Sequence, residues 1–323
     1  MTARRDMLIA LAALARLPAQ AQQVAKMPLI GILDREPSSR YLEAFRQGMR
    51  ESGYVDGQNV AFEYRYNYGK VAEFSRLAAE LVQHKVDLIF AASTPAALAA
   101  QAATNTIPIV FAVVADPVVA KVIASLAKPG GNATGLTTNN TEIVGKRLSI
   151  LKEISGGKAA RLAMLMDPSD PSHGQSLQAA QDPARRLGMT LRSFPVNGPE
   201  EFDAAFSSMM SMRIDSLVVP AGVSMNSHAK RIADLAAKSR LPAMYAASEF
   251  VDAGGLVSYA ASFADNYRRA ATYVDKILKG ALPRDLPVEQ ASTLELTINR
   301  RAANALGLNL PSGLLILATR IIE

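Results

Sequence analysis

Hydroxyl, carboxyl and glycine residues recur directly after the short apolar runs of this chain. A serine or threonine at a helix start, such as Ser93 or Thr94, offers its hydroxyl and nearby backbone N–H groups to an anion such as a carboxylate. The same residue types cap helix N-termini, so capping remains an alternative interpretation of both residues. The candidate ligand-contacting residues found after apolar runs are Ser39, Ser93, Thr94, Asp116, Asp167, Ser172 and Gly222.

Asp116 and two tyrosines carry further possibilities for contact with a ligand. Asp116 precedes Pro117, where its carboxylate would either meet a cationic or hydroxyl group or cap a turn. Tyr245 and Tyr259 end two later apolar runs. Their rings would either stack on a ring of the ligand or lie half-buried as ordinary aromatic residues. The hydroxyl groups of the whole set suit a ligand that carries a carboxylate.

Few residues suit metal, cofactor or catalytic chemistry. The 323-residue chain has no cysteine, which excludes disulfides, zinc–thiolate sites and thiol nucleophiles. Its histidines, His84, His173 and His228, are far apart, and none has a metal-ligand partner at helical spacing. The sequence contains no glycine-rich dinucleotide motif, phosphate-binding loop or nucleophile elbow. We therefore expect no metal, no cofactor and no enzymatic activity.

The N-terminal segment has the three parts of a secretory signal. Arg4 and Arg5 form a basic region, residues 7–17 are mostly apolar, and residues 19–21 (AQA) provide a small-x-small cleavage pattern. We expect residues 1–21 to be a signal peptide cleaved near Ala21, so that the protein is exported to the periplasm. An amphipathic N-terminal helix is the alternative, and the general and twin-arginine export routes both remain open.

From residue 28 onward, short apolar runs alternate with helical patterns. The first series predicts strands at residues 29–33, 59–66, 86–91 and 109–113 and helices at 39–52 and 71–83, after Thr94, and from Asp116 to about 126. The second series predicts strands at 161–166, 190–194, 216–219, 243–245 and 256–259 and helices at 143–154, 176–187 and 228–239. This alternation predicts two doubly wound α/β lobes with parallel sheets, with one eight-fold barrel as the rival. Ligands of such sheets lie beyond the carboxyl ends of the strands.

Seven segments of the chain carry recognisable motifs: residues 45–54 (FRQGMRESGY), 94–98 (TPAAL), 107–111 (IPIVF), 126–135 (LAKPGGNATG), 273–281 (YVDKILKGA), 286–290 (LPVEQ) and 295–299 (ELTIN). These segments resemble the solute-binding components of ABC transporters, in the family that includes tryptophan- and phenylalanine-type binding proteins. The likeness extends from about residue 28 to 323.

The resemblance implies a type I periplasmic-binding-protein-like fold, with two lobes joined by a three-segment hinge that closes on a ligand. Lobe one would comprise residues 28–135 plus 260–286, and lobe two residues 140–258 plus 290–323. Thr94 and Asp116 would face the cleft, together with Thr137 and Asn139 near the first crossing. The implied partners are a small-molecule ligand and an ABC permease in the inner membrane. We expect a monomer that binds no nucleic acid, because the net charge of +6 is spread along the chain.

The ligand implied by the resemblance is an amino acid, including aromatic or branched ones, or a related organic acid. Relatives often carry an Asp or Asn after the motif that reads Val219 and Pro220 here, but this chain continues with Ala221 and Gly222. The missing acid leaves a small carboxylate without an ammonium group as an alternative ligand. A secreted α/β isomerase or hydrolase and a ligand sensor for a receptor kinase remain alternative functions.

Overall fold

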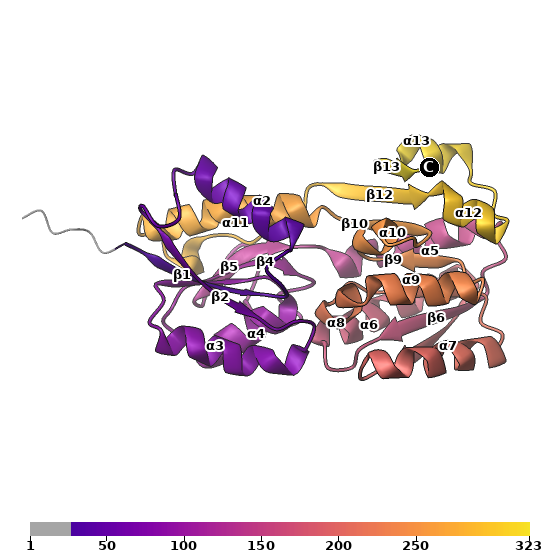
Figure 1. Ribbon diagram of the computed structural model, residues 1–323, viewed down its shortest axis with the longest axis horizontal. Helices are drawn as coiled ribbons and strands as arrows, with labels where there is room; N and C mark the ends of the chain where they lie inside the picture. Colours follow the sequence, from indigo (N-terminus) through magenta and orange to yellow (C-terminus); the bar gives the residue numbers. More distant parts are fainter. Residues whose placement is uncertain (1–26) are drawn as a thin grey trace, which may run out of the picture.

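The computed structural model describes residues 27–323 as two α/β lobes side by side (Figure 1). The sheet of the first lobe is parallel throughout, in the order β11-β5-β4-β3-β1-β2. Its strands are β1 (Leu29–Asp34), β2 (Ala61–Tyr66), β3 (Leu88–Ala91), β4 (Ile109–Val114), β5 (Ala133–Thr137) and β11 (Glu289–Gln290). Its helices are α2 (Arg40–Glu51), α3 (Phe74–Gln83), α4 (Thr94–Ala103) and α11 (Phe263–Leu278), with short 3₁₀ turns at Val71–Glu73 and Pro283–Asp285.

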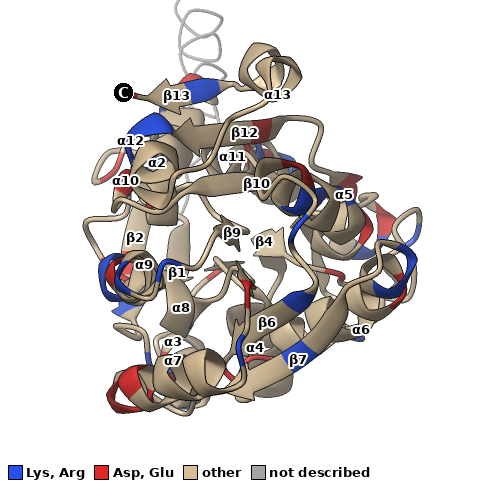
Figure 2. Ribbon diagram, turned by 90° about the vertical axis from the view of Figure 1, so that its right-hand side faces the viewer, with Lys and Arg blue, Asp and Glu red and all other residues tan. Residues whose placement is uncertain are grey.

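The second lobe holds a sheet in the order β13-β12-β10-β9-β8-β6-β7, with both signs of charge on its outer helices (Figure 2). Its strands are β6 (Arg161–Met166), β7 (Thr190–Pro195), β8 (Ser216–Val219), β9 (Ala243–Tyr245), β10 (Val257–Ala261), β12 (Leu294–Asn299) and β13 (Arg320–Ile322). Its helices are α5 (Asn140–Ile154), α6 (Pro171–Arg186), α7 (Phe202–Ser211), α8 (Val223–Ser227), α9 (Ala229–Lys238), α10 (Glu249–Asp252), α12 (Arg300–Leu306) and α13 (Ser312–Leu317), with a 3₁₀ turn at Pro199–Glu201.

The chain passes between the two sheets three times. The connections are residues 138–139 between β5 and α5, Ser262 between β10 and α11, and residues 291–293 between β11 and β12. Because β10 leaves the second lobe at the same edge where β12 re-enters it, Ala261 pairs with Leu294 and the two strands run antiparallel. The second sheet is thus parallel except where β10 pairs with β12.

The packing of α2 against α11 illustrates how local sequence builds the first lobe. The buried face of α2 carries Leu42, Phe45 and Met49 at helical spacing, next to Gly48. A Cβ on Gly48 would lie 2.3 Å from the carbonyl oxygen of Arg268 on α11. The glycine therefore allows the two helix backbones to approach closely, and α11 in turn covers β4.

The helix predicted from Asp116 to about residue 126 is wrong, because the segment forms a series of turns. The Asp116 carboxylate accepts a hydrogen bond from the N–H of Val119, and the N–H of Ala120 bonds to the Asp116 carbonyl. Lys121 then adopts a left-handed conformation with φ of 60°, which ends the segment after a single helical turn.

The predicted signal peptide, residues 1–21, lies outside the described residues. Within residues 27–323, no helix is long and apolar enough to cross a membrane.

Candidate functional site

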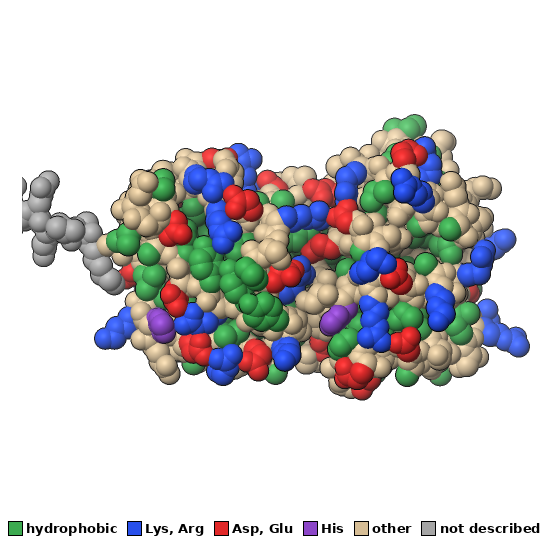
Figure 3. Space-filling view, in the orientation of Figure 1, with side chains coloured by type: hydrophobic (Ala, Val, Ile, Leu, Met, Phe, Trp, Pro, Cys, Tyr) green, Lys and Arg blue, Asp and Glu red, His purple; other side chains and the backbone are tan. Residues whose placement is uncertain are grey.

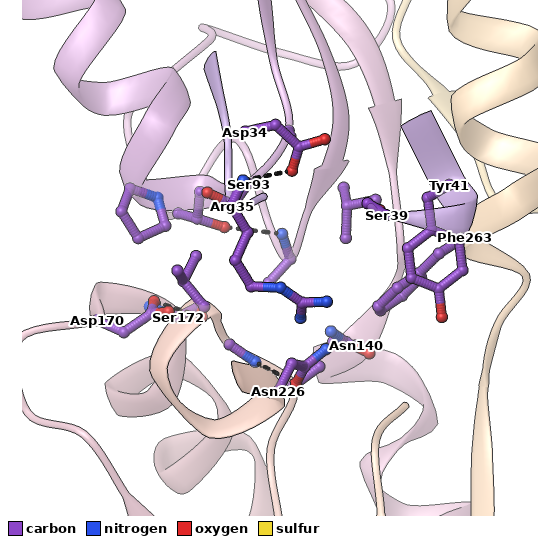
Figure 4. A pocket seen from close by; sticks show the side chains of 18 of the residues that line it. Asp34, Arg35, Ser39, Tyr41, Ser93, Asn140, Asp170, Ser172, Asn226 and Phe263 are labelled. Carbon is purple, nitrogen blue, oxygen red and sulfur yellow. Dashed lines mark hydrogen bonds between the residues drawn. The ribbon is translucent and has the colours of Figure 1, made fainter. Parts of the chain in front are cut away.

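A cavity lies between the two lobes, at the carboxyl ends of their strands. Polar side chains enter it from both lobes, and Figure 4 shows Asp34, Arg35 and Ser93 above Asp170, Ser172 and Asn226. Its other lining residues are Ser39, Tyr41, Ala92, Thr94, Pro95, Val113, Ala115, Asn140, Ala221, Gly222, Val223, Glu249, Phe263 and Tyr267.

Helix α4 begins at the cavity and presents its positive N-terminal end to it. Ser93 caps this helix, because its Oγ accepts a hydrogen bond of 3.3 Å from the N–H of Ala96. The hydroxyl hydrogen of Ser93 stays available to an acceptor in the cavity. Thr94 is buried, and its Oγ1 accepts a bond of 3.1 Å from the N–H of Ala115. The helix end and the Ser93 hydroxyl together suit a carboxylate.

Asp34 ends β1 as a buried carboxyl group at the cavity wall. Its oxygens accept hydrogen bonds from the N–H of Arg35 at 2.6 Å and from the hydroxyl of Tyr267 at 3.3 Å. Burial raises the pKa of Asp34 to about 6, although these hydrogen bonds and the Arg35 charge favour the ionised form. The same burial raises the pKa of the Tyr267 hydroxyl well above its ordinary value.

Arg35 extends from lobe one into the middle of the cavity (Figure 4). Its Nε and Nη2 donate to Oε1 of Glu36 at 3.0 and 2.8 Å. Its Nη1 lies 3.6 Å from Oε1 of Glu249, which belongs to α10 of lobe two. The Arg35 guanidinium thus brings a positive charge to the cavity, and it reaches from lobe one to the Glu249 carboxylate of lobe two.

Lobe two contributes an acid with one free oxygen. Oδ1 of Asp170 accepts from the N–H and the hydroxyl of Ser172 at 3.0 and 2.6 Å and so caps α6. Oδ2 of Asp170 is buried without a hydrogen-bond partner among the described residues, as is Nε2 of His173, 4.0 Å away. A Cβ on Gly222 would lie 2.8 Å from Oδ2 of Asp170 and 2.2 Å from Nε2 of His173, so only glycine fits there.

Helices α8 and α10 complete the polar floor in lobe two. Oδ1 of Asn226 accepts from the N–H of Gly222 at 3.2 Å, and its Nδ2 lies 3.4 Å from Oε1 of Glu249. An apolar wall stands on the lobe-one side, where the rings of Tyr41 and Phe263 meet edge to face at 5.6 Å. The cavity therefore offers charged groups beside a surface for an apolar or aromatic ligand group.

A family model described as ABC transporter substrate binding protein matches residues 26–322. The chain belongs to this family. Members of the family are substrate-binding proteins of transporters, which are not enzymes. The predicted fold class, two doubly wound lobes of the type I periplasmic-binding-protein kind, is confirmed.

Three relatives of this substrate-binding protein have informative names. A tyrosine-binding protein of Clostridioides difficile (strain R20291) is 27% identical over 264 residues, which are 82% of this chain and 75% of the relative. A Streptococcus pneumoniae ABC domain in complex with L-Trp is 27% identical, with 91% of this chain and 99% of that chain covered and a TM-score of 0.85. The ligand-free, open structure of a Clostridium difficile substrate-binding protein with adhesive properties is 26% identical, with 92% and 99% covered and a TM-score of 0.64.

The predicted ligand-contacting residues fall into two groups. Those that line the cavity between the lobes are Ser39, Ser93, Thr94, Ser172 and Gly222. Those that lie outside its lining are Asp116, Thr137, Asn139, Asp167, Tyr245 and Tyr259.

The second group makes contacts within the protein. Thr137 donates to the carbonyl of Ala115 at 3.1 Å, and Asn139 precedes α5 with a left-handed φ of 52°. Asp167 accepts from the N–H of Ser169 at 2.8 Å.

The two tyrosines of this group lie in lobe two. Tyr245 is fully buried and stacks on Phe250 at 4.7 Å, beside a separate pocket of lobe two. The carbonyl of Tyr259 accepts from Nε of Arg147 at 2.6 Å.

The sequence analysis missed the charged residues of the cavity. Arg35 lies in the polar stretch 34–39 from which only Ser39 was selected, and Asp170 lies in the stretch 167–172 from which Asp167 and Ser172 were selected. Glu249 begins α10, four positions after the predicted strand at 243–245, from which only Tyr245 was selected. Lobe two supplies two acids to the cavity, Asp170 and Glu249, although residues 219–222 carry none.

Proposed function

We propose that this substrate-binding protein binds a small carboxylate-bearing solute, an amino acid or a related organic acid, and delivers it to an ABC importer. The observation that carries the proposal is the meeting of the α4 N-terminus, the Ser93 hydroxyl and the Arg35 guanidinium in one cavity between the lobes. Each of these groups favours a bound carboxylate. Tyr41 and Phe263 provide a wall for an apolar or aromatic part of the solute.

Hinge closure over the solute is part of this proposal. The three connections at residues 138–139, 262 and 291–293 are the segments that would bend. The chain has a TM-score of 0.85 with the L-Trp complex and 0.64 with the ligand-free, open protein, although both are about equally similar in sequence. This difference supports a lobe arrangement that resembles the ligand-bound one. A solute would stabilise this closed form through contacts to both lobes.

The same proposal places the protein outside the cytoplasmic membrane, where it delivers the solute to a permease. It would act there as a monomer that binds no nucleic acid, after removal of the signal peptide at residues 1–21. The face of the molecule in Figure 3 mixes cationic and anionic side chains over both lobes, with hydrophobic side chains gathered over the first lobe. Size-exclusion chromatography with light scattering of the exported protein tests the monomer.

Calorimetric titration tests the carboxylate site. Ser93→Ala removes the hydroxyl that would donate to the carboxylate, and we expect about 10-fold to 100-fold weaker binding of whichever amino acid or organic acid binds the wild type. Ser169→Ala is the matched control, because Ser169 donates only to Asp167 outside the cavity lining. Equal affinities of the wild type and Ser93→Ala would contradict the site. Chemical turnover of a bound solute would favour the secreted enzyme instead.

A further inference from the structure

A second pocket lies within lobe two, apart from the cavity between the lobes. Its lining comes mainly from α9, β9, α10 and α12, and none of these lining residues lines the inter-lobe cavity. Figure 1 shows α12 at the end of lobe two that faces away from lobe one. Alanine methyl groups form much of the walls, with Ala233, Ala236 and Ala237 on α9 and Ala302 and Ala305 on α12. The pocket therefore offers an apolar surface to a ligand.

The lining of this lobe-two pocket includes a phenol hydroxyl without a partner. Tyr245 is fully buried, and its hydroxyl oxygen has no hydrogen-bond partner within residues 27–323. Buried tyrosine hydroxyls usually have a partner. Burial raises the pKa of this hydroxyl, so the group keeps its proton and can donate it in a hydrogen bond. Tyr245 is therefore an unused donor at the pocket.

Gly255 locates the hydroxyl end of the Tyr245 ring. A Cβ on Gly255, which also lines the lobe-two pocket, would lie 2.5 Å from Cε2 and 3.1 Å from Cζ of Tyr245. Because Cζ carries the hydroxyl, the phenol end of the ring lies beside a residue of the pocket lining. The face of the same ring packs on Phe250, with the two rings nearly parallel. The hydroxyl thus points toward the pocket while the ring is held by the core.

Arg301 adds an unpaired positive charge to the lobe-two pocket. The residue is exposed, and its guanidinium forms no ion pair or hydrogen bond within residues 27–323. Asp252, the acid in the lining, is already neutralised, because its carboxylate lies 2.8 Å from Nη1 of Arg40 and 2.5 Å from Nη2 of Arg320. The pocket is therefore electropositive, and an anionic group of a ligand complements it.

We propose that the lobe-two pocket is a second binding site, for a small carboxylate whose apolar body carries a hydrogen-bond acceptor. The carboxylate pairs with Arg301, the apolar body lies along the alanine walls, and the acceptor receives the hydrogen bond of the Tyr245 hydroxyl. Burial of the apolar body and a hydrogen bond to a donor that is otherwise unpaired supply the affinity. This site is separate from the inter-lobe cavity and does not depend on the solute that binds there.

NMR of the purified protein, labelled at its alanine methyl groups, tests the site, because alanines line both pockets. The probe is 4-hydroxybenzoate, and we expect saturable shifts at Ala237 and Ala305, whereas Ala92 and Ala221 report on the inter-lobe cavity. Benzoate lacks the acceptor and 4-hydroxybenzyl alcohol lacks the charge, so each should bind the lobe-two pocket about fivefold or more weaker. Shifts confined to Ala92 and Ala221, or no shifts, overturn the inference.

Two variants assign the contacts. Tyr245→Phe should bring the affinity for 4-hydroxybenzoate to within about twofold of that for benzoate. Because the hydroxyl has no partner in the protein, the melting temperature of this variant without ligand should equal or exceed that of the wild type. Arg301→Gln should weaken 4-hydroxybenzoate about fivefold and leave 4-hydroxybenzyl alcohol unchanged. Arg300→Gln is the matched control, because Arg300 lies on the same helix but pairs with Glu323 outside the pocket lining.

The variants also define the results that contradict the site. A folded Tyr245→Phe variant that still prefers 4-hydroxybenzoate to benzoate would remove the hydroxyl from the account and overturn the inference. Equal losses in Arg300→Gln and Arg301→Gln would show a general effect of surface charge, which also overturns it. Binding of 4-hydroxybenzoate in the inter-lobe cavity alone would support the proposed function and reject the second site.

Discussion

Arg147 of α5 is buried without a carboxylate partner among residues 27–323, and its Nη2 donates to Oδ1 of Asn140 at 2.7 Å. Its Nε donates to the carbonyl of Tyr259 at 2.6 Å. Asn140 begins α5 directly after the first connection between the lobes, and Tyr259 lies on β10 just before the second. The guanidinium therefore joins the lobe-two ends of two connections, and burial lowers its pKa to about 9.

Arg147→Gln should reduce the stability of the second lobe. The shorter amide side chain would leave the Tyr259 carbonyl or the Asn140 side chain without its donor, and we expect a loss of about 2–3 kcal/mol in the free energy of unfolding. Urea unfolding followed by circular dichroism measures it. Arg161→Gln is the control, because Arg161 is 54% exposed and lies 3.6 Å from Asp215. Equal stability of both variants would contradict the role of Arg147.

Two helical glycines should respond to alanine in opposite directions. A Cβ on Gly48 would lie 2.3 Å from the Arg268 carbonyl oxygen, so Gly48→Ala should force α2 and α11 apart and cost about 1–3 kcal/mol. Gly174 lies in α6 with nothing within 4 Å of such a Cβ, so Gly174→Ala should stabilise by about 0.5–1 kcal/mol. Thermal and urea unfolding of the two variants decides the signs. Changes of the same sign would refute the close approach of the helices.

Asp34 should make stability fall as pH rises through the acid range. Because burial raises the pKa of Asp34 to about 6 in the folded protein, the unfolded chain releases this proton at lower pH than the folded chain does. Between about pH 4 and 6, the free energy of unfolding therefore decreases with pH. The Asp34→Asn variant lacks this ionisation, so its stability relative to the wild type should rise by up to about 3 kcal/mol between pH 4 and 7.

Urea unfolding of the wild type and Asp34→Asn across this pH range measures the difference. The groups that face the carboxyl are the N–H and charge of Arg35, the Tyr267 hydroxyl and the Glu36 charge. These groups remain in the variant, so the comparison isolates the proton of Asp34. A stability difference that stays constant from pH 4 to 7 would show that the carboxyl ionises alike in the folded and unfolded states.

Arg40 should contribute a weak, salt-sensitive contact between the lobes. Its Nη1 lies 2.8 Å from Oδ2 of Asp252, and its Nη2 donates to Oγ of Ser248 at 2.8 Å. Because Arg40 is 51% exposed, the ion pair is worth at most about 1 kcal/mol. Arg40→Gln should weaken binding of any solute by about fivefold or less and reduce the dependence of affinity on salt. Titrations at low and high sodium chloride measure this, and an unchanged salt dependence would exclude the contact.

The fold was predictable where local patterns were strong. The run at residues 29–33 and the spacing of Leu42, Phe45 and Met49 predicted β1 and α2 nearly to their observed ends. Strand β5 was missed because Gly135 interrupts its apolar pattern. Gly135 has a φ of 146°, and the backbone of Phe111 approaches it closely. Strands β12 and β13 depend on the third connection, which no local pattern encodes.

The site was predictable only for residues at helix starts. Ser93 and Ser172 follow strands and begin helices, and both line the cavity. Arg35 and Glu249 become neighbours because the two lobes meet, and their separation of 214 positions hides that contact from any local pattern. Tyr245 ends a strand as predicted, yet its ring turns into the core against Phe250.

Closure of the lobes over a bound solute is the central claim, and a distance between the lobes tests it most directly. Because the chain has no cysteine, Ser75→Cys on α3 and Ser207→Cys on α7 place spin labels at two exposed sites on different lobes. Pulsed electron–electron double resonance measures the distance between the two labels. It should give a longer or broader distribution without solute and a single shorter distance with a saturating amino acid or organic acid. A distribution that the saturating solute leaves unchanged would contradict the account.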